Sequence, residues 1–292
     1  MRKPFNTIGI LGKPNNPEVA ETAEILYQHL GEKVERVIVD QQMAKDMKLA
    51  SEDSVSRNEL AQQSDMVIVV GGDGSMLNAG RLLANYDVPV LGINRGYLGF
   101  LTDISPTDML QRVDDVLAGD YIEELRFLLF AKVYRNDQQQ GESEALNDIV
   151  LYPGEISKML DFEVYIDDMF AFSQRSDGII VSTPTGSTAY ALSGGGPIMH
   201  PSIEALALVP MHPHTLSMRP IVVNIESCID IVVADTNRYH PQISCDGQLT
   251  FPVEPGDRIS IRKKRRQLWL LHPSDYDYYH VLRTKLGWGA KL

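Results

Sequence analysis

One short stretch, residues 65–81, combines an apolar run with a glycine-rich turn around a single carboxylate. Residues 66–70 are apolar and mostly β-branched, which is typical of a parallel strand buried on both faces. Positions 71–74 then hold three glycines, and a helical spacing of apolar residues begins at Met76. Because a glycine loop at a helix start presents backbone N–H groups to an anion, the stretch predicts a phosphate site.

Asp73, the carboxylate within this loop, calls for an explanation because bound phosphates repel it. It can accept a proton from an attacking hydroxyl group, or it can meet the phosphates through a divalent cation. The structural alternative is that Asp73 merely caps the following helix. Since short glycine motifs occur often by chance, the loop alone does not decide between these interpretations.

Four further stretches contain small and polar residues where a purely structural strand would have large apolar side chains. Residues 94–101 form a glycine-hinged loop with aromatics, suited to covering a planar ring. Asn147 and Asp148 can hold a ribose diol or an adenine edge. Residues 175–178 and 183–197 are rich in hydroxyls, charges and glycines, and the last begins and ends a helix. Taken singly, each stretch is better explained as a turn or a cap, but together with the phosphate loop they favour a nucleotide site.

Composition limits the class of protein. A chain of 292 residues allows two domains, and a formal net charge of -12 argues against nucleic acid or an anionic membrane surface as the partner. No apolar run approaches the ~18 residues of a membrane span, and the N-terminus lacks an apolar signal segment. Cys228 and Cys245 are too few for a disulfide framework or a zinc site. We therefore expect a cytoplasmic protein with reduced thiols.

Residues 1–122 alternate strands with helices, which predicts a doubly wound parallel sheet. The expected strands are 7–12, 34–39, 66–70 and 88–93, and the expected helices start at Asn16-Pro17 and near Asp108, the second ending near Gly119. Ligands bind such sheets at the carboxyl ends of the strands. The loops at 71–74 and 94–100 both follow strands, so both should lie at that edge.

Residues 123–273 instead contain short β-rich runs, which predicts a mostly antiparallel, β-sandwich-like domain with a helical insertion after Gly186. Turn signals are Asp167-Asp168, Asp246-Gly247 and Pro255-Gly256. The basic run 262–266 is interpreted as a solvated hairpin tip, and His212 and His214 as loop residues rather than metal ligands. The tail 274–292 has many large apolar groups, so we expect it to pack back, on the N-terminal domain.

The motifs together resemble the signature of bacterial NAD kinases. The stretches that carry the resemblance are Gly71-Gly-Asp-Gly74, residues 92–101, Asn147-Asp148, residues 184–190 with 193–197, and Asp246-Gly-Gln248. The glycine loop alone is shared with phosphofructokinases and with diacylglycerol and sphingosine kinases, whereas the combination is far more specific. The resemblance implies transfer of the ATP γ-phosphoryl group to the 2′-hydroxyl of the adenosine ribose of NAD.

The resemblance also implies roles for single residues. Asp73 matches the carboxylate that takes the 2′-hydroxyl proton. The implied binding residues are Gly72, Asp73, Gly74, Phe100, Asn147, Asp148, Lys158, Arg175, Asp177, Ser187, Thr188, Ala189, Tyr190, Ala191, Leu192, Ser193 and Gln248. Asp148 stands where many members have Glu, and Ser75 where many have Thr; both changes keep the chemistry.

The family pattern further implies ATP as donor, NAD as acceptor, a divalent cation (Mg²⁺ or Mn²⁺) and a homodimer or homotetramer joined through the β domains. No protein residue is expected to form a dedicated metal site. Two alternatives remain open at this level. One is a lipid or sugar kinase that shares the phosphate loop, and the other is a non-catalytic sensor that binds NAD(P) without turnover.

Overall fold

The computed structural model describes residues 5–49, 51–96, 98–155 and 158–288. The chain divides into two compact units: unit 1 comprises Met1–Leu125 and Leu268–Leu292, and unit 2 comprises Arg126–Gln267. Two long strands, β6 (Tyr121–Arg135) and β17 (Arg258–Pro273), contribute residues to both units. Unit 2 is therefore inserted between two segments of unit 1.

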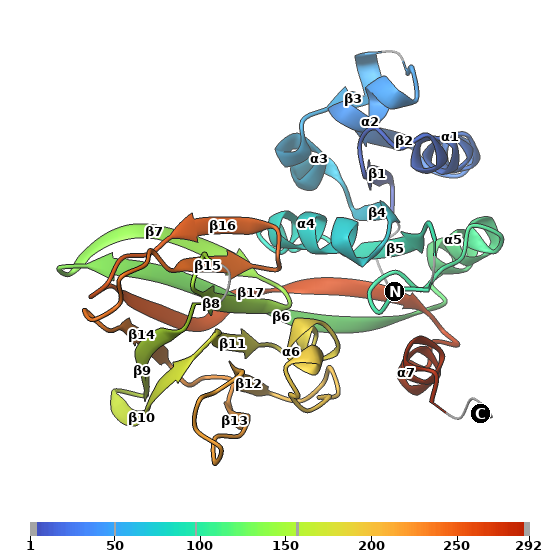
Figure 1. Cartoon of the computed structure of the whole chain (residues 1–292). Helices are drawn as coiled ribbons and strands as arrows, with labels where there is room; N and C mark the ends of the chain where they lie inside the picture. Colours follow the sequence, from blue (N-terminus) through green and yellow to red (C-terminus); the bar gives the residue numbers. More distant parts are fainter. Residues whose placement is uncertain (1–4, 50, 97, 156–157, 289–292) are drawn as a thin grey trace. The chain divides into compact units, whose positions relative to one another are not determined.

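Unit 1 contains a parallel sheet with the strand order β17-β5-β4-β1-β2-β3 (Figure 1). Its elements are β1 (Thr7–Gly12), α1 (Pro17–Gly31), β2 (Arg36–Asp40), α2 (Gln41–Asp46), the 3-10 helix η1 (Ser51–Asp53), β3 (Ser54–Val55), α3 (Arg57–Gln63), β4 (Met66–Gly71), α4 (Asp73–Leu83), β5 (Val90–Asn94), α5 (Met109–Leu117) and α7 (Tyr278–Leu286). In this order β4 lies between β1 and β5, so the glycine loop follows a central strand.

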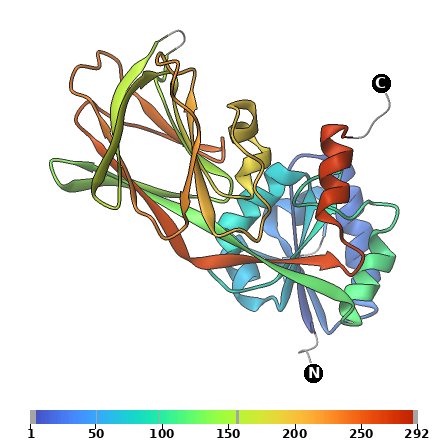
Figure 2. The ribbon, with the colours of Figure 1, turned by 90° about the horizontal axis from the view of Figure 1, so that it is seen from below.

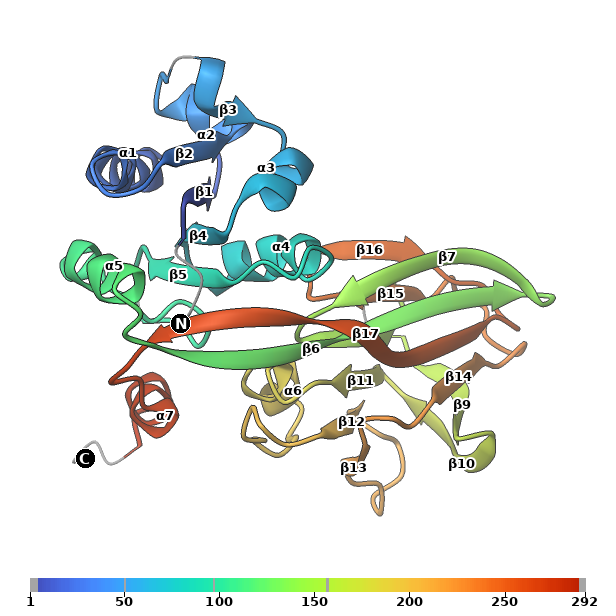
Figure 3. The same ribbon diagram turned by 180° about the vertical axis from the view of Figure 1, so that it is seen from behind.

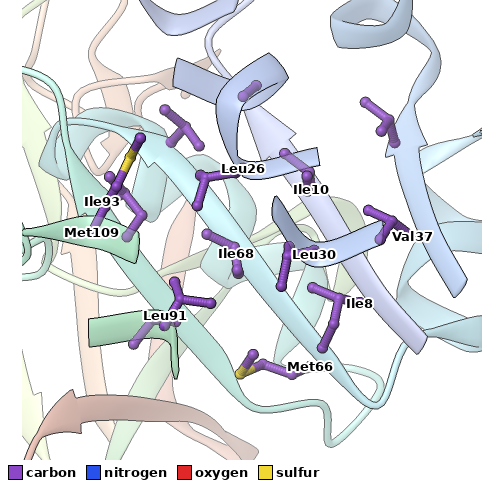
Figure 4. Packing of buried hydrophobic residues seen from close by; sticks show 14 of the residues in the cluster. Ile8, Ile10, Leu26, Leu30, Val37, Met66, Ile68, Leu91, Ile93 and Met109 are labelled. Carbon is purple, nitrogen blue, oxygen red and sulfur yellow. The ribbon is translucent and has the colours of Figure 1, made fainter. Parts of the chain in front are cut away.

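Helices cover both faces of this sheet. Ile8 and Ile10 of β1 point toward α1, where Leu26 and Leu30 complete a core from which water is excluded (Figure 4). Gly9, between them, faces the other way, where an added Cβ would lie 2.6 Å from a methyl carbon of Leu60 on α3. Alternate strand residues thus bury themselves against opposite helical layers, and the predicted doubly wound arrangement is confirmed.

Local sequence signals set most element ends. Asn16 caps α1, because its side chain accepts from the backbone N–H groups of Glu18 and Val19, as the sequence predicted. The second strand was predicted two residues too early: Val34 N donates to Leu30 O in the turn after α1, so the strand begins at Arg36. Likewise β5 begins at Val90.

Unit 2 consists of two antiparallel sheets. One has the order β10-β9-β14-β17, with β6 paired to β17 and to β7, and the other has the order β13-β12-β11-β8-β15-β16. Figure 3 follows β6 beside β17. The remaining elements are β7 (Gln138–Ala145), β8 (Asp148–Tyr152), β9 (Leu160–Ile166), β10 (Met169–Ser176), β11 (Gly178–Ser182), η2 (Gly186–Thr188), α6 (Tyr190–Ser193), β12 (Ala205–Met211), β13 (Ile221–Asn224), β14 (Ile229–Val233), β15 (Gln242–Cys245) and β16 (Leu249–Pro252).

The two sheets of unit 2 share one apolar core. Phe162 and Ile231 from the first sheet pack in the same buried cluster as Leu151, Ile179 and Leu208 from the second. Along β9 buried residues alternate with partly exposed ones, and along β12 alternate residues belong to this cluster and to a second apolar cluster on the other face. Two sheets that bury one face of each against the other form a sandwich. The predicted β-sandwich-like domain is therefore confirmed, with the helical insertion at η2 and α6.

Two of the predicted turns have the expected backbone. Asp167 and Asp168 (φ 52° and 63°) join β9 to β10, and Asp246 and Gly247 (φ 54° and 63°) join β15 to β16. Positive φ at both residues is what the two-residue β9–β10 hairpin needs, whereas the β15–β16 connection has a third residue, Gln248.

The predicted hairpin tip at residues 262–266 is wrong, because the whole run lies within β17. Carboxylates of unit 2 neutralise part of its charge: Lys263 Nζ lies 2.6 Å from Glu226 Oε1, and Lys264 Nζ lies 2.6 Å from Glu144 Oε2. The charges therefore line a strand rather than interrupt it. A count of lysines and arginines could not reveal these partners, which are more than 30 residues away in the sequence.

The C-terminal segment forms helix α7 within unit 1 (Figure 2). Asp277 caps its start and Gly287, with φ 66°, ends it. Val281 and Leu282 are buried, and Arg112 of α5 binds Asp275 at 2.6 Å just before the helix. Residues 289–292 of the tail lie outside the described residues. None of the helices in the described ranges combines the length and apolarity needed to span a bilayer.

Candidate active site

The glycine loop joins β4 to α4 as the sequence predicted. Gly71 has φ 152°, and a Cβ at this position would collide with the hydroxyl of Ser75. Gly72 is the N-cap of α4 and has no side chain, so the N-cap residue itself provides no oxygen acceptor to this helix start. In the same unit α1 and α3 are capped by Asn16 and Ser56. A helix start without a side-chain cap attracts an anion.

Asp73 does not cap α4, which removes the structural alternative considered above. Its carboxylate reaches instead across to the loop after β5: Oδ2 accepts from Phe100 N at 2.9 Å and Oδ1 accepts from Leu101 N at 3.0 Å. The Thr102 hydroxyl lies 3.4 Å from the same Oδ1. These bonds fix the direction of a half-buried carboxylate at the phosphate loop and join the two loops that the sequence assigned to one edge.

Gly99 makes this close approach possible. A Cβ at Gly99 would collide with Asp73 Oδ1, and it would also lie 2.5 Å from the Thr102 hydroxyl oxygen. Gly99 N donates to Thr102 O at 3.0 Å, which closes the turn around the carboxylate. The φ of Gly99 is not positive, so its backbone conformation is open to any residue. Glycine is required here because there is no space for a Cβ.

The loop 94–101 was predicted to cover a planar ring with its aromatics. Phe100 is half-buried, and Lys285 Nζ lies 5.8 Å from the centre of its ring. Tyr97, the other aromatic of the predicted cover, lies outside the described residues. The role of Phe100 as a binding residue stays a prediction.

Unit 2 contains a cavity of about 550 Å³. It is lined by Asn147, Asp148, Val150, Tyr152, Asp177, Ala189, Tyr190, Met211, His212, Ser244, Asp246, Gly247 and Thr250. Five of the predicted binding residues are among them: Asn147, Asp148, Asp177, Ala189 and Tyr190. The size and the mixture of apolar walls with a few polar groups suit part of a nucleotide.

Asp246 was predicted as part of a turn and of the Asp246-Gly-Gln248 motif, without a role of its own, yet it holds the cavity's amide and carboxylate pair in position. Its Oδ1 accepts from Asn147 N at 2.7 Å and lies 3.4 Å from Asp148 N, while Oδ2 accepts from Leu146 N at 3.1 Å. On the other side the Thr183 hydroxyl donates to Leu146 O at 2.6 Å. The side chains of Thr183 and Asp246, which follow Leu146 by 37 and 100 residues in the sequence, therefore fix the start of β8.

Asp148 lies at the wall of this cavity and is 4% exposed. Burial, and to a lesser degree the negative charge of Asp246, raise the pKa of Asp148 from 3.8 to about 7. Near neutral pH this carboxyl group can therefore either donate or accept a hydrogen bond. Both modes suit the hydroxyl groups of a ribose.

Asp177 and His212 form an exposed pair at the rim of the cavity. His212 Nδ1 lies 3.0 Å from Asp177 Oδ2, and His212 has φ 44°. No sequence signal pointed to this pair, because Asp177 follows β10 whereas His212 follows β12. The loop interpretation agrees with its position after Met211.

The other predicted binding residues between positions 186 and 193 are partly buried and partly exposed. The Ser187 hydroxyl bonds within its own segment, donating to Pro184 O at 2.6 Å and accepting from Met199 N at 3.0 Å. Ala191 packs in an apolar cluster with Ile180 and Val209. Thr188, Leu192 and Ser193 are partly or fully exposed and do not line the cavity.

Three more predicted residues lie elsewhere in unit 2. Arg175 is exposed on β10, opposite Asp161 of β9. Lys158 Nζ lies 4.5 Å from the ring centre of Tyr239. Gln248 is exposed in the β15–β16 turn, and its N–H donates to Cys245 O. Their contacts with a ligand stay predictions.

Within residues 5–49, 51–96, 98–155 and 158–288, no group of three or more His, Cys, Asp or Glu side chains is arranged to hold a metal ion. Mg²⁺ commonly keeps several waters and binds through one or two carboxylates together with substrate phosphates. The carboxylate of Asp73 beside the phosphate loop fits that mode.

Family models match most of the chain. The ATP-NAD kinase N-terminal domain matches residues 8–121 and the ATP-NAD kinase C-terminal domain matches residues 146–272. Among curated relatives, the chain is 51% identical over 293 residues to the NAD kinase of Pectobacterium atrosepticum and 51% identical over 292 residues to that of Salmonella newport, covering 100% of each.

Solved structures share the fold. A yeast NADH kinase complexed with NADH aligns with a TM-score of 0.88 and 25% identity, covering 100% of this chain and 90% of that one. An NAD kinase from Archaeoglobus fulgidus in complex with ATP aligns with a TM-score of 0.72 and 24% identity, covering 96% of this chain and 97% of that one.

Proposed function

The chain belongs to the NAD kinase family, and on that premise we propose how its two units carry out the reaction. The enzyme transfers the γ-phosphoryl group of ATP to the 2′-hydroxyl of the adenosine ribose of NAD, giving NADP and ADP. We assign the donor phosphates to the glycine loop of unit 1. We assign NAD to the cavity of unit 2, where Asn147 and Asp148 meet a ribose or an adenine edge.

In the proposed step the ribose 2′-oxygen attacks the γ-phosphorus, the bond from phosphorus to the β-γ bridging oxygen breaks, and ADP leaves. The 2′-hydroxyl proton goes to the carboxylate of Asp73. Each oxygen of Asp73 accepts one backbone hydrogen bond; Oδ1 also faces the Thr102 hydroxyl, and Oδ2 retains a lone pair for a further donor. Because the transition state is loose, correct orientation of this carboxylate contributes more than strong basicity.

A divalent cation, Mg²⁺ or Mn²⁺, supplies charge neutralisation on the phosphates when it is bound. Asp73 is the side chain that would hold it, together with phosphate oxygens and water. The chain's own part is to orient: Gly72 starts α4 without a side chain that would keep an anion away, and Gly99 lets the loop close on Asp73.

The observation that carries this proposal is the orientation of Asp73. Two backbone N–H groups of the loop after β5 hold the Asp73 carboxylate beside the start of α4. Asp73 does not cap this helix, so capping does not explain why a carboxylate stands there. A non-catalytic sensor gains nothing from negative charge at that place. A lipid or sugar kinase is disfavoured because the similarity to NAD kinases extends over the full length of the chain.

The experiment is a coupled assay in which purified protein receives NAD, ATP and Mg²⁺ and a strictly NADP-dependent dehydrogenase reports the product. NADP formed by the wild type but not by Asp73→Asn supports both the reaction and the role of Asp73. Folded wild-type protein that forms no NADP would contradict the proposal.

We also propose a cytoplasmic homodimer or homotetramer joined through unit 2. β10 is the edge strand of its sheet and exposes Met169 and Phe170, at 69% and 58%. An apolar edge strand tends to pair with a second chain. Cys228 and Cys245 are free thiols, which supports a reducing compartment.

A further inference from the structure

Arg95 is attached directly to the phosphate loop through its backbone. β4 and β5 are neighbouring parallel strands in which Gly71 lies opposite Asn94, and Arg95 N donates to Gly71 O at 3.1 Å. Arg95 therefore leaves the carboxyl edge of the sheet beside the glycine that begins the loop. Ligands of doubly wound sheets bind at this edge.

One donor of the Arg95 guanidinium group has no acceptor among the described residues. Its side chain is 23% exposed, and Nε is buried without a hydrogen-bond acceptor. The nearest acids are Glu18 Oε2, 3.9 Å from Nε, and Glu21 Oε2, 3.6 Å from an Nη atom. Both distances exceed a hydrogen bond, and both glutamates are more than 70% exposed on α1.

A buried donor without an acceptor is costly in a folded protein unless a ligand supplies the acceptor. Phosphate oxygens are suitable acceptors, because a guanidinium group binds them with parallel, charge-assisted N–H bonds. The phosphate loop itself, residues 71–75, contributes a carboxylate and no cationic side chain. Transfer between anions needs positive charge at the donor phosphates.

We propose that Arg95 binds the phosphates of the donor nucleotide, exchanging its long ion pairs with Glu18 and Glu21 for phosphate oxygens. This inference rests on the proposed function, since it names a residue that contacts the donor in that reaction. Glu18 and Glu21 compete with the donor for the same guanidinium group. Removing their charge should therefore strengthen donor binding, and removing Arg95 should weaken it.

The test compares steady-state KM values for ATP and for NAD in four proteins. Arg95→Gln should raise the KM for ATP at least about tenfold, the loss expected for a charge-assisted hydrogen bond, and change the KM for NAD less than about twofold. Arg95→Lys should have a KM for ATP between those of the wild type and Arg95→Gln, because Lys keeps the positive charge but lacks the planar pair of N–H donors. Glu21→Gln should lower the KM for ATP.

Arg36→Gln is the matched control, because Arg36 begins β2 at the opposite, amino edge of the sheet. There its guanidinium group donates to Gln63 Oε1 at 3.2 Å and its backbone N–H donates to Asn6 O. It should leave both KM values unchanged. An unchanged KM for ATP in Arg95→Gln, or an equal rise in both KM values, would overturn the role of Arg95. Urea unfolding of each variant checks that the fold is retained.

Calorimetric titration with ATP separates this inference from the proposed function. If the wild type binds ATP and Arg95→Gln binds it at least about tenfold more weakly, Arg95 is a donor-binding residue even if no NADP forms. If NADP forms and both proteins bind ATP equally, the function holds and the assignment of Arg95 is wrong. If the wild type binds no ATP, both are wrong.

Discussion

The carboxylate of Asp73 accepts a hydrogen bond from the backbone N–H of Phe100, 27 residues later in the chain, at 2.9 Å. This bond and its neighbour from Leu101 connect the glycine loop after β4 to the loop after β5. The side chain proposed to accept the proton is thus also the side chain that orders the loop beside it.

Replacing Asp73 by Asn should lower turnover at least about 100-fold, because general base catalysis typically contributes ~10²–10⁴-fold. The NH2 of the Asn side chain then faces a backbone N–H, which places two donors against each other. The free energy of unfolding of the variant should therefore also fall by about 1–3 kcal/mol. Turnover in the coupled assay and urea unfolding measure the two effects. Thr102→Val, which removes only the 3.4 Å contact, serves as the milder comparison. Wild-type turnover in Asp73→Asn would remove Asp73 from the mechanism.

Replacing Gly99 by Ala tests the same contact from the other side. The new Cβ would collide with Asp73 Oδ1, so we expect the carboxylate to turn and kcat to fall at least about tenfold. Gly31→Ala is the control, because a Cβ there meets no atom within 4 Å. A normal kcat in Gly99→Ala would mean that the orientation of Asp73 by the loop is not needed.

Asp148 should make stability depend on pH. Burial and Asp246 raise its folded-state pKa to about 7, against about 3.9 in the unfolded chain. Between pH ~4 and ~7 the folded state keeps a proton that the unfolded state releases, so stability falls as pH rises, and the cost is complete above pH ~7. It amounts to at most about 4 kcal/mol.

Asp148→Asn cannot ionise, so urea unfolding should find this variant more stable than the wild type at pH 8, with the difference shrinking toward pH 4.5. Asp168→Asn, in an exposed turn, controls for a general effect of replacing Asp by Asn on unfolding. A difference that stays constant with pH would contradict the burial argument.

Asp246→Asn should weaken NAD binding through the backbone that Asp246 holds. The variant places an amide group against the N–H groups of Asn147 or Leu146, so the KM for NAD should rise about tenfold while the KM for ATP changes little. Steady-state kinetics with each substrate varied in turn measures both. Equal changes in the two KM values would indicate a general loss of folding instead.

Phe170→Glu should reduce the proposed oligomer to a monomer. A charge on the edge strand β10 prevents pairing with a second chain. Light scattering at micromolar concentration gives the mass of wild type and variant. Lys132→Glu, on a strand that is not an edge partner of β10, is the control. A monomeric wild type would refute the proposal outright.

Those secondary-structure elements whose ends depend on neighbouring residues could be predicted from the sequence. The β4 strand, its glycine turn and α4 follow from an apolar run that ends in glycines, and Asn16 with Pro17 set the start of α1. The full length of β17 could not be predicted, because the partners that neutralise Lys263 and Lys264 come from distant parts of the chain.

In the candidate site, too, residues with a local sequence signal were predicted, and residues whose role depends on distant parts of the chain were not. Asn147 and Asp148 stood out as a polar pair before an apolar run, whereas Asp246, which holds them, lies about 100 residues away. The bonds are made because β8 pairs with β15, and nothing local predicts that pairing. The orphan Nε of Arg95 likewise depends on where α1 lies, which the composition of its loop does not reveal.

The insertion of unit 2 into unit 1 has a consequence for synthesis on the ribosome. β17 pairs with β5 through Leu270 and Leu271, and these residues are translated only after the whole of unit 2. Until then β5 presents an unpaired parallel edge, which is an aggregation hazard. The nascent chain must therefore carry an incomplete first sheet through the synthesis of more than a hundred further residues, so the unit whose chain starts first is the last to be completed.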